Sequence, residues 1–437
     1  MKVDKPDQLT RLATLLAVGI VVLAPFHAFL TVWLASIVGH YTLLRMWDNI
    51  ATLLVAVGAA IVIIRRPVFR RQIVGDVLLR CIVLYVMLSI LLGIVSWLRH
   101  EVSITALGYG LTVNLRFLLF FAAVYVLVRA KGHNGLNLTR VVLVPAAVVG
   151  IVALLQYSVL PHDFLKHFGY RHSTIDPVET INNDPRYIRT MATLRGANPL
   201  GAYMVAIAGL VAALWHKNRR WAYSIIGVLV FLALWFSFSR SAWIGAVIAV
   251  TVAIWLRLPS KKIRIRAAIG GLILVVVVAA AAAAFRTSGG LQNALFHTSD
   301  TSKVAVSSNQ AHASASRDAL KDVLAEPFGR GPGTAGPASV YNHGHATRIA
   351  ENYYLQIAQE AGWAGLILFL ACLALVAQRL YQARHIPMAL GVLAGLVGVS
   401  FVCLLTHAWA DDTLAFTWWG IAAFALGQNS LESEKRA

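Results

Sequence analysis

Residues 267–285, AAIGGLILVVVVAAAAAAF, form an apolar run without a charged side chain, and the polar stretch RTSGGLQNALFHTSDTSKVAVSS (286–308) follows directly. An α-helix needs about 20 apolar residues to cross the hydrocarbon core of a membrane, which is about 30 Å thick. The run therefore predicts a membrane-spanning helix, and the polar stretch predicts that the chain leaves the membrane at its end. The run is continuously apolar rather than alternating, which excludes a transmembrane β-barrel strand.

Similar runs recur along the whole chain of 437 residues, in which 58% of residues are hydrophobic and only 13% are charged. So few charges cannot cover the surface of a water-soluble protein. The predicted fold class is an all-α integral membrane protein with about twelve transmembrane helices, the first too long for a cleaved signal peptide. The predicted helices are residues 12–37, 47–64, 76–97, 111–128, 141–160, 197–215, 221–238, 241–256, 267–285, 361–377, 386–406 and 413–428.

These helices divide the chain into three parts. Residues 1–285 hold the first nine helices, with a smaller outer loop at residues 161–196. Residues 286–360 form one large loop, and residues 361–437 hold the last three helices and a tail. Within the large loop, residues 311–326 are predicted to form a short amphipathic helix.

Basic residues are concentrated in every second connection between the predicted helices, and such clusters in short loops stay on the cytoplasmic side. The clusters are residues 65–71, 129–140, 216–220, 257–266 and 378–385. With an even number of helices, they place both termini in the cytoplasm and both long loops in the periplasm. This topology accounts for most of the formal net charge of +19, so we expect no binding to nucleic acid.

The cysteines and the missing motifs exclude several kinds of chemistry. Cys81, Cys372 and Cys403 all fall within predicted helices and lack the spacing of metal ligands, so they are expected to fill apolar space. The chain has no Walker motif and no G-x-G-x-x-G motif after a strand, which argues against nucleotide-driven activity. It also shows no internal repeat of the kind that many secondary transporters carry.

Several arginines lie at the outer ends of the predicted helices or in the outer loops. The preference of basic residues for cytoplasmic loops does not explain them. A charge at membrane depth costs several kcal/mol unless it is paired or hydrated, so such a residue is a functional candidate. Arginine pairs bidentately with phosphate and stays protonated, so these residues are predicted to bind a lipid-linked diphosphate. The candidates are Arg116, Arg186, Arg189, Arg195, Arg240 and Arg348.

Asn198 is a supporting candidate, because Gly196, Asn198 and Pro199 predict the start of a helix next to Arg195. The backbone N–H groups at such a helix start favour an anion.

Three segments, in this order, resemble the O-antigen ligase and O-antigen polymerase superfamily: FSFSRSAWIG (236–245), EPFGRGPGTAG (326–336) and ENYYLQIAQEAGWAGLI (351–367). The usual forms in that family are an S-R junction between two spans, a P-x-G-x-G-x-G turn, and an H-N-x-Y-L helix start followed by G-x-x-G. A further segment, RGANPLGAYM (195–204), is similar to the family's R-G-x-x-x-N-P-x-x-L-G region, slightly shortened. The resemblance covers roughly residues 186–365.

One departure concerns the general base. Glu351 stands where many relatives carry the histidine before the asparagine, here Asn352. His343 and His345 precede this position and are predicted jointly as the base, with Glu351 orienting the imidazole or acting as the base itself. Asn352 and Tyr353 are expected to support the site. The histidines of the large loop are His297, His312, His343 and His345.

The resemblance implies a GT-C-like glycosyltransferase at the periplasmic face of a Gram-negative inner membrane. Its donor would be O-antigen on an undecaprenyl-diphosphate carrier, and its acceptor a hydroxyl of lipid A–core, in the last step of lipopolysaccharide assembly. One dominant outer loop favours an O-antigen ligase, because polymerases more often have two sizeable loops. An O-antigen polymerase, a protein O-oligosaccharyltransferase and, from another class, a membrane transporter are the alternatives.

The predicted mechanism is a direct displacement that inverts the anomeric carbon. The arginines stabilise the charge on the departing diphosphate while a histidine accepts the hydroxyl proton. No cofactor and no metal are expected, because arginines can replace a divalent cation and the sequence shows no acidic cluster. His407, Asp411 and Asp412, between the last two predicted helices, could contribute an acid or an ion pair.

Overall fold

The structure, a computed structural model, describes residues 7–130, 136–181, 184–215, 220–260, 262–266, 269 and 308–436. Within these ranges, nine helical stretches are long and apolar enough to cross a membrane. The chain is therefore an all-α integral membrane protein in its main features. The predicted helix at 267–285 lies outside the described residues except for Ile269, so the count of twelve and the three-part division stay predictions.

Most predicted helices have a counterpart in the structure. The nine stretches are α1 with α2 (Gln8–Leu23 and His27–Val38), α3 with α4 (Tyr41–Leu44 and Trp47–Arg65), α6 (Val77–Leu98), α7 (Ile104–Arg129), α8 (Leu138–Ser158), α9 (Ala197–Leu214), α10 (Arg220–Ser237), α11 (Arg240–Arg257) and α15 (Tyr353–Gln382). The last two predicted spans coincide with α16 (Pro387–Val402) and α17 (Asp412–Arg436). Among the described residues, the remaining α-helices are α5 (Pro67–Val74) and α14 (Ser308–Ala325).

Polar side chains in front of apolar runs set where several of these helices begin. Asp76, Ser103 and Asn352 accept hydrogen bonds from first-turn N–H groups of α6, α7 and α15, respectively. Such caps satisfy donors that the helix itself leaves without a partner. α9 begins at Ala197, directly after Gly196, as the sequence predicts.

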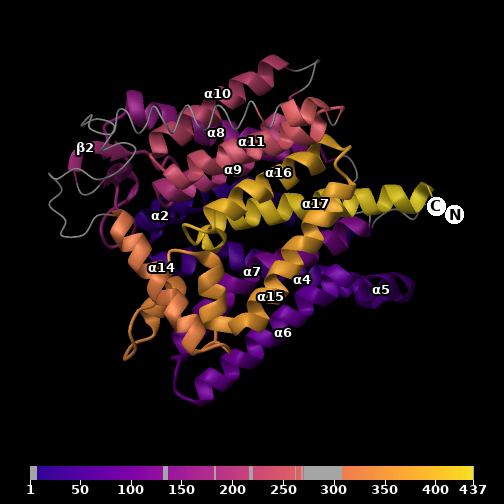
Figure 1. The fold of residues 1–437 in the computed structure, drawn as a ribbon, viewed down its shortest axis with the longest axis horizontal. Coiled ribbons are helices and arrows are strands. Elements are labelled where there is room, and N and C mark those ends of the chain that lie inside the picture. Colours follow the sequence, from indigo (N-terminus) through magenta and orange to yellow (C-terminus); the bar gives the residue numbers. More distant parts are fainter. Residues whose placement is uncertain are drawn as a thin grey trace.

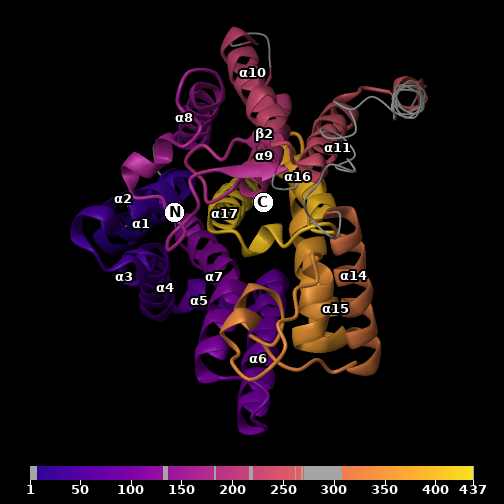
Figure 2. The ribbon, with the colours of Figure 1, turned by 90° about the vertical axis from the view of Figure 1, so that its left-hand side faces the viewer.

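The centre of the bundle is formed by α7, α9 and α17. Figure 2 shows α17 between α7, α9 and α16, and α17 packs against all three. Around this centre, α10 packs on α8 and α9, while α6 packs on α15. Cys81 of α6 lies 3.2 Å from Cys372 of α15, measured between the Sγ atoms, and all three cysteines are buried and free, as expected for apolar filling.

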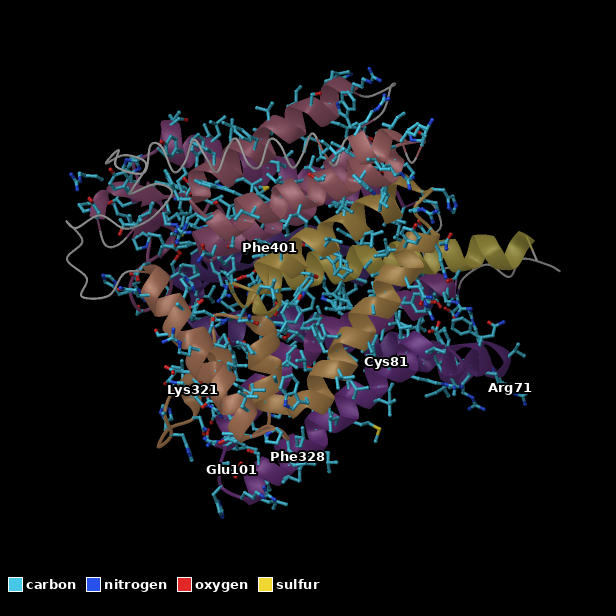
Figure 3. The ribbon with its side chains drawn as sticks, in the orientation of Figure 1. Arg71, Cys81, Glu101, Lys321, Phe328 and Phe401 are labelled. Atoms are coloured by element: carbon cyan, nitrogen blue, oxygen red, sulfur yellow. The ribbon has the colours of Figure 1, made fainter. Side chains whose placement is uncertain are left out.

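The two ends of the bundle differ. The loop at 161–196, for which no strand was predicted, contains an antiparallel pair of strands, β1 (Glu179–Ile181) and β2 (Asp184–Arg189). This pair and α14 lie at one end, which we call the pocket end, and α5 lies at the other (Figure 1). Lys321 of α14 and Arg71 of α5 mark these opposite ends in Figure 3.

α15 bends at Gly362, where φ is +64°, and its two halves take different directions (Figure 1). The glycine-rich segment 327–336 crosses at this bend, where Gly331 N donates to the Glu360 carbonyl at 2.7 Å. The buried carboxylate of Glu360 accepts from Gly333 N at 2.8 Å and from Asn114 Nδ2 at 2.5 Å. These bonds join the large loop to α7 and place the start of α15 beside α14.

Candidate active site

A pocket of about 560 Å³ opens at the pocket end, between the strands, the α10–α11 junction and α14. We call it the arginine pocket, because it is lined by Arg189 and Arg240. It also contains Asn198 and Glu351, so it brings together four residues predicted from sequence segments far apart in the chain. Its lining residues are Thr180, Ile181, Arg189, Asn198, Phe238, Ser239, Arg240, Ser241, Ile244, His312, Ala313, Ser316, Glu351, Leu405 and Thr406.

Arg189 is held at the end of β2 by three neighbours. Its Nη2 donates to Asn198 Oδ1 at 2.6 Å and its Nε to the Ser237 carbonyl at 2.9 Å. Glu179 lies 3.7 Å away and also accepts from the first N–H of α9. Burial lowers the pKa of the Arg189 guanidinium, and Glu179 opposes that shift, but an arginine remains charged at neutral pH.

Arg240 is the first residue of α11, and Phe238 to Ser241 all line the pocket. The N–H groups at a helix start carry partial positive charge, which favours an anion there. The charges of Arg189 and Arg240 act on one another, and like charges facing one pocket raise the free energy of the empty site. A bound diphosphate would relieve this repulsion.

Two residues of the pocket have a strained backbone. Phe238 has φ +49° and Glu351 has φ +51°, in the left-handed region that non-glycine residues rarely adopt. Such strain is typical of functional sites, where the surrounding structure holds a residue in a required position. Both strained residues face the same pocket, which supports its assignment as the site.

His312 and Glu351 face one another across the pocket, with His312 Nδ1 3.5 Å from Glu351 Oε2. His312 belongs to α14, with Ser316 one turn further along on the same pocket wall. Because Nδ1 faces the carboxylate, Nε2 is the nitrogen left to accept a proton from a substrate. This histidine was visible in the sequence but lacked a distinguishing signal, because its position opposite Glu351 depends on how α14 packs.

A second polar pocket, of about 260 Å³, lies at the same end of the bundle. We call it the aspartate pocket; its lining residues are His27, Ala28, Thr31, Tyr41, Arg45, Thr174, Ile175, Arg195, Asp411, Asp412 and Thr413. Arg195 Nε donates to Asp411 Oδ2 at 2.6 Å. Burial disfavours the Arg195 charge, but Asp411 and Asp412 outweigh burial and raise the pKa of this guanidinium.

Arg116 lies beneath the aspartate pocket, on α7. Its Nη2 pairs with Asp412 and donates to the Ala410 carbonyl at 2.9 Å, and its guanidinium lies 5.6 Å from the Phe416 ring centroid. The sequence predicted Arg116 and Arg195 as diphosphate ligands together with Arg189 and Arg240. In the structure, Arg189 and Arg240 line the arginine pocket and Arg195 lines the aspartate pocket, while Arg116 lines neither. Arg116 and Arg195 are both paired with carboxylates.

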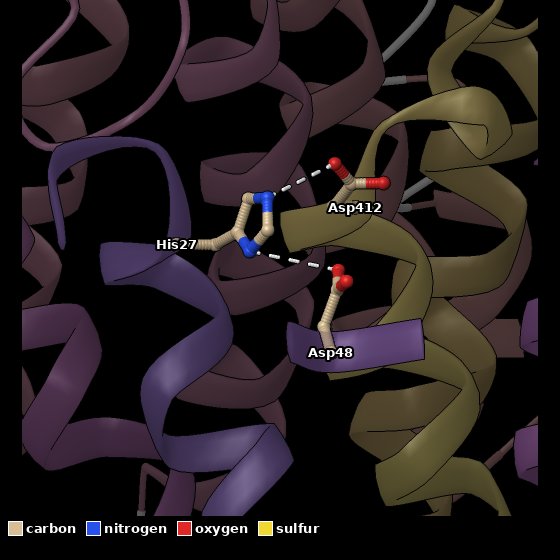
Figure 4. A group of neighbouring side chains, drawn as sticks. All are labelled: His27, Asp48 and Asp412. Carbon is tan, nitrogen blue, oxygen red and sulfur yellow. Dashed lines mark ion pairs between the residues drawn. The ribbon is translucent and has the colours of Figure 1, made fainter. Parts of the chain in front are cut away.

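His27 lies between two buried carboxylates beside the aspartate pocket (Figure 4). Its Nδ1 is 3.6 Å from Asp48 Oδ2, and its Nε2 is 3.5 Å from Asp412 Oδ2. Among the described residues, these three side chains are close enough together to hold a metal ion. The sequence showed no such group because His27, Asp48 and Asp412 come from α2, α4 and α17.

His407 lies on the chain segment that joins the two pockets. Leu405 and Thr406 before it line the arginine pocket, and Asp411 after it lines the aspartate pocket. Burial lowers the pKa of the His407 imidazole, and the charge of Glu351 opposes this shift, so the ring is neutral at pH 7. Its Nδ1 has no hydrogen-bond partner in the described ranges.

Arg348 and Arg186 lie outside both pockets and have carboxylate partners. Arg348 Nε donates to Asp322 Oδ2 at 2.9 Å, and its Nη2 lies 3.5 Å from Glu326 Oε2, which fastens α14 to the segment before α15. Arg186 projects from β2 with two thirds of its side chain exposed and pairs with Asp184 at 2.6 Å.

The predicted histidine pair lies elsewhere. His343 and His345 are both exposed, on either side of Gly344, and neither lines the arginine pocket or the aspartate pocket. Their role as base stays a prediction, and the geometry favours a different imidazole, that of His312.

Asn352 and Tyr353 contribute to the structure around the site. Asn352 caps α15 by accepting from Tyr354 N and Leu355 N, and its Nδ2 donates to the Leu404 carbonyl at 3.0 Å. Tyr353 is fully buried, with its ring 5.7 Å from that of Phe369. Both residues fix the position of Glu351, which directly precedes them.

Comparison with known proteins identifies the region that carries the site. A family model described as O-antigen ligase matches residues 225–370, about a third of the chain. No curated protein matches the chain. The matched region includes most of the residues that line the arginine pocket, among them Arg240, His312 and Glu351. The lining residues outside it are Thr180, Ile181, Arg189, Asn198, Leu405 and Thr406. Over this region, the chain is similar to the O-antigen ligase family.

Proposed function

We propose that this protein is an O-antigen ligase, which transfers a glycan from an undecaprenyl-diphosphate carrier to a hydroxyl of lipid A–core. In this proposal the pocket end faces the periplasm of a Gram-negative inner membrane, and both chain termini are cytoplasmic. The observation that carries the proposal is the arginine pocket, where Arg189, Arg240 and the start of α11 face the pair formed by His312 and Glu351.

The donor diphosphate binds Arg189 and Arg240 in this proposal. Two guanidinium groups and a helix start offer donors to the phosphate oxygens and stabilise the charge that develops on them as the sugar leaves. The bond between the anomeric carbon and the diphosphate breaks, and the diphosphate takes the electron pair. Arginines supply this stabilisation without a divalent cation, so the transfer is expected to proceed in EDTA.

The acceptor hydroxyl attacks the anomeric carbon from the opposite face, which inverts its configuration. His312 Nε2 takes the hydroxyl proton, and Glu351 stabilises the imidazolium that forms. This keeps the role that the sequence predicted for Glu351 and gives the imidazole role to His312 in place of His343 and His345.

The test is a transfer assay with purified protein, undecaprenyl-diphosphate-linked O-antigen, lipid A–core and EDTA. Wild-type protein should form high-molecular-weight lipopolysaccharide on a gel. His312→Ala should slow transfer by about 10²-fold or more, the usual contribution of a general base, and the double variant H343A/H345A should stay near the wild-type rate.

Three other results would change the proposal. Loss of activity in H343A/H345A but not in His312→Ala would return the base to the residues chosen from the sequence. Lengthening of the lipid-linked glycan without transfer to lipid A–core would identify a polymerase, and glycosylation of an added acceptor protein would identify a protein O-oligosaccharyltransferase. No reaction with these donors and acceptors would favour a transporter.

A further inference from the structure

The aspartate pocket combines hydrogen-bond acceptors and donors in nearly equal measure. Asp411 and Asp412 contribute acceptors, while Arg45 and Arg195 contribute donors. Hydroxyl groups, which can do both, come from residues on four separate segments of the chain. They are Thr31, Tyr41, Thr174 and Thr413.

The charges around the pocket exclude an ionic ligand on energetic grounds. Asp411 is paired with Arg195, and Asp412 with Arg116, so the pocket presents charges of both signs close together. A divalent cation would meet the positive charges of Arg45 and Arg195, and a phosphate would meet those of Asp411 and Asp412. Either ion would be repelled by half of the lining charges.

The geometry of His27 also disfavours a metal ion. Asp48 and Asp412 approach different ring nitrogens, on opposite sides of the imidazole (Figure 4). A metal ion binds one nitrogen of a histidine, so both carboxylates would have to gather at the same nitrogen. An imidazole that bridges two carboxylates instead holds Asp412 in a fixed orientation at the pocket wall.

We infer that the aspartate pocket binds the hydroxyl groups of a neutral sugar and that it is the acceptor subsite. The acceptor role rests on the proposed function. A sugar hydroxyl both donates and accepts a hydrogen bond, so it can be satisfied by a carboxylate and an arginine at once. The set of groups that repels both kinds of ion therefore suits a polyhydroxylated ligand.

The path between the pockets agrees with this assignment. Residues 405–413 run from the wall of the arginine pocket to the wall of the aspartate pocket, with the half-buried His407 between them. This segment therefore links the wall of the proposed sugar site to the wall of the proposed diphosphate site.

Thr31 provides a second, independent observation. It lines the aspartate pocket, its side chain is 2% exposed, and its Oγ1 has no hydrogen-bond partner in the part of the chain that the structure describes. A buried hydroxyl without a partner destabilises a protein, and a ligand hydroxyl in the pocket would satisfy it.

The first experiment measures binding alone, with full-length purified protein and dephosphorylated core oligosaccharide, by saturation-transfer NMR. Wild-type protein should bind, and Thr31→Val and Tyr41→Phe should each raise Kd by about fivefold, the usual effect of losing one hydrogen bond. Arg240→Ala, in the other pocket, should leave this Kd unchanged. Thr31→Val should also unfold at a higher temperature than wild type when no sugar is present, which shows that the fold is intact.

Competition separates the ligand classes. If Mn²⁺ binds and Asp48→Asn abolishes that binding, or if inorganic pyrophosphate displaces the oligosaccharide from wild type but not from Arg195→Gln, the pocket is an ion site and the inference is wrong. An unchanged Kd in both Thr31→Val and Tyr41→Phe would also overturn it.

The transfer assay then separates the inference from the proposed function. If transfer occurs, Thr31→Val and Tyr41→Phe should raise KM for the acceptor by about fivefold and leave KM for the donor unchanged. An unchanged acceptor KM would refute the acceptor subsite. If no transfer occurs but the variants change sugar binding as expected, the assignment of a sugar-binding site is supported and only the proposed reaction is wrong.

Discussion

At the scale of single residues, the informative contrast is between the two arginines that line the arginine pocket and those whose carboxylate partners lie elsewhere. Arg116, Arg195 and Arg348 are paired with Asp412, Asp411 and Asp322. Arg189 and Arg240 line the arginine pocket together, where the charges of an anionic ligand would balance theirs. Their side chains are held by the packing around them, so a ligand meets donors already in place.

Replacing Arg240 by alanine should lower kcat/KM for the lipid-linked donor by about 10²-fold, because one donor to the departing diphosphate is lost. Arg240→Lys should recover only part of this loss, since an ammonium group cannot pair bidentately with a phosphate. Steady-state rates at varied donor concentration would measure both effects.

Lys166→Ala is the matched control for charge at the same end of the molecule. Lys166 is exposed and pairs with Asp163 at 2.5 Å, away from both pockets. The rate of glycan transfer by Lys166→Ala should stay within about twofold of the wild-type rate, because screened surface charges contribute little. An equal loss in Lys166→Ala and Arg240→Ala would point to a general electrostatic effect and away from a specific site.

At the scale of elements, the bend in α15 determines where the pocket wall stands. Gly329 and Gly362 meet there with positive φ angles of +74° and +64°, and a Cβ atom built on Gly329 would lie 2.5 Å from Gly362 N. The first part of α15 and α14 can pack side by side only because the loop crosses this closely. Glu351, at the start of α15, takes its position from the same contact.

Gly329→Ala should therefore destabilise the protein by about 2 kcal/mol or more, through left-handed strain together with the steric overlap. Gly344→Ala is the matched control: its φ is +89°, but a Cβ atom there meets nothing within 4 Å. Gly344→Ala should lower the free energy of unfolding only by the backbone strain, about 1 kcal/mol. Thermal unfolding in detergent would compare the two, and equal losses would show that steric crowding at the bend does not matter.

At the scale of the whole molecule, an ion cluster opposite the pocket end holds several helices together. Arg379 of α15 pairs bidentately with Asp76, the cap of α6, at 2.7 and 2.9 Å. Tyr125 of α7 donates to the same carboxylate at 3.0 Å. Burial alone would raise the pKa of Asp76, but the bonds from Arg379 and Tyr125 outweigh it and lower the pKa.

This lowered pKa predicts a pH dependence of stability. Asp76 stabilises the fold fully above the ordinary aspartate pKa of about 4, and the stabilisation is lost as the pH falls through the lower pKa of the folded state. Asp76→Asn should thus unfold at a temperature several degrees below wild type at pH 7, with the difference shrinking below about pH 4.

Asp163→Asn serves as the control for a carboxylate whose pKa is also lowered, here mainly by the hydrogen bond from Lys166. Asp163 is exposed, so its removal should leave the unfolding temperature nearly unchanged. A pH-independent difference between wild type and Asp76→Asn would show that Asp76 acts through packing and not through its charge.

Much of the fold could be predicted from local sequence. Apolar runs located the helices, and the start of α9 followed from Gly196 and Pro199. The strand pair at 179–189 was missed because strands of three and six residues in a polar loop carry too weak a pattern. Of the candidate site, Arg189, Asn198, Arg240 and Glu351 were predicted and lie together.

The sequence by itself determined that this chain crosses a membrane many times and that part of it resembles the O-antigen ligase family, because hydropathy and short motifs depend only on neighbouring residues. Only the tertiary structure decided which polar groups share a pocket. His312 meets Glu351, and His27 meets Asp48 and Asp412, through the packing of helices distant in sequence. A buried charge is stabilised by whichever partner the packing brings near, so its role is set by the fold and not by its sequence neighbours.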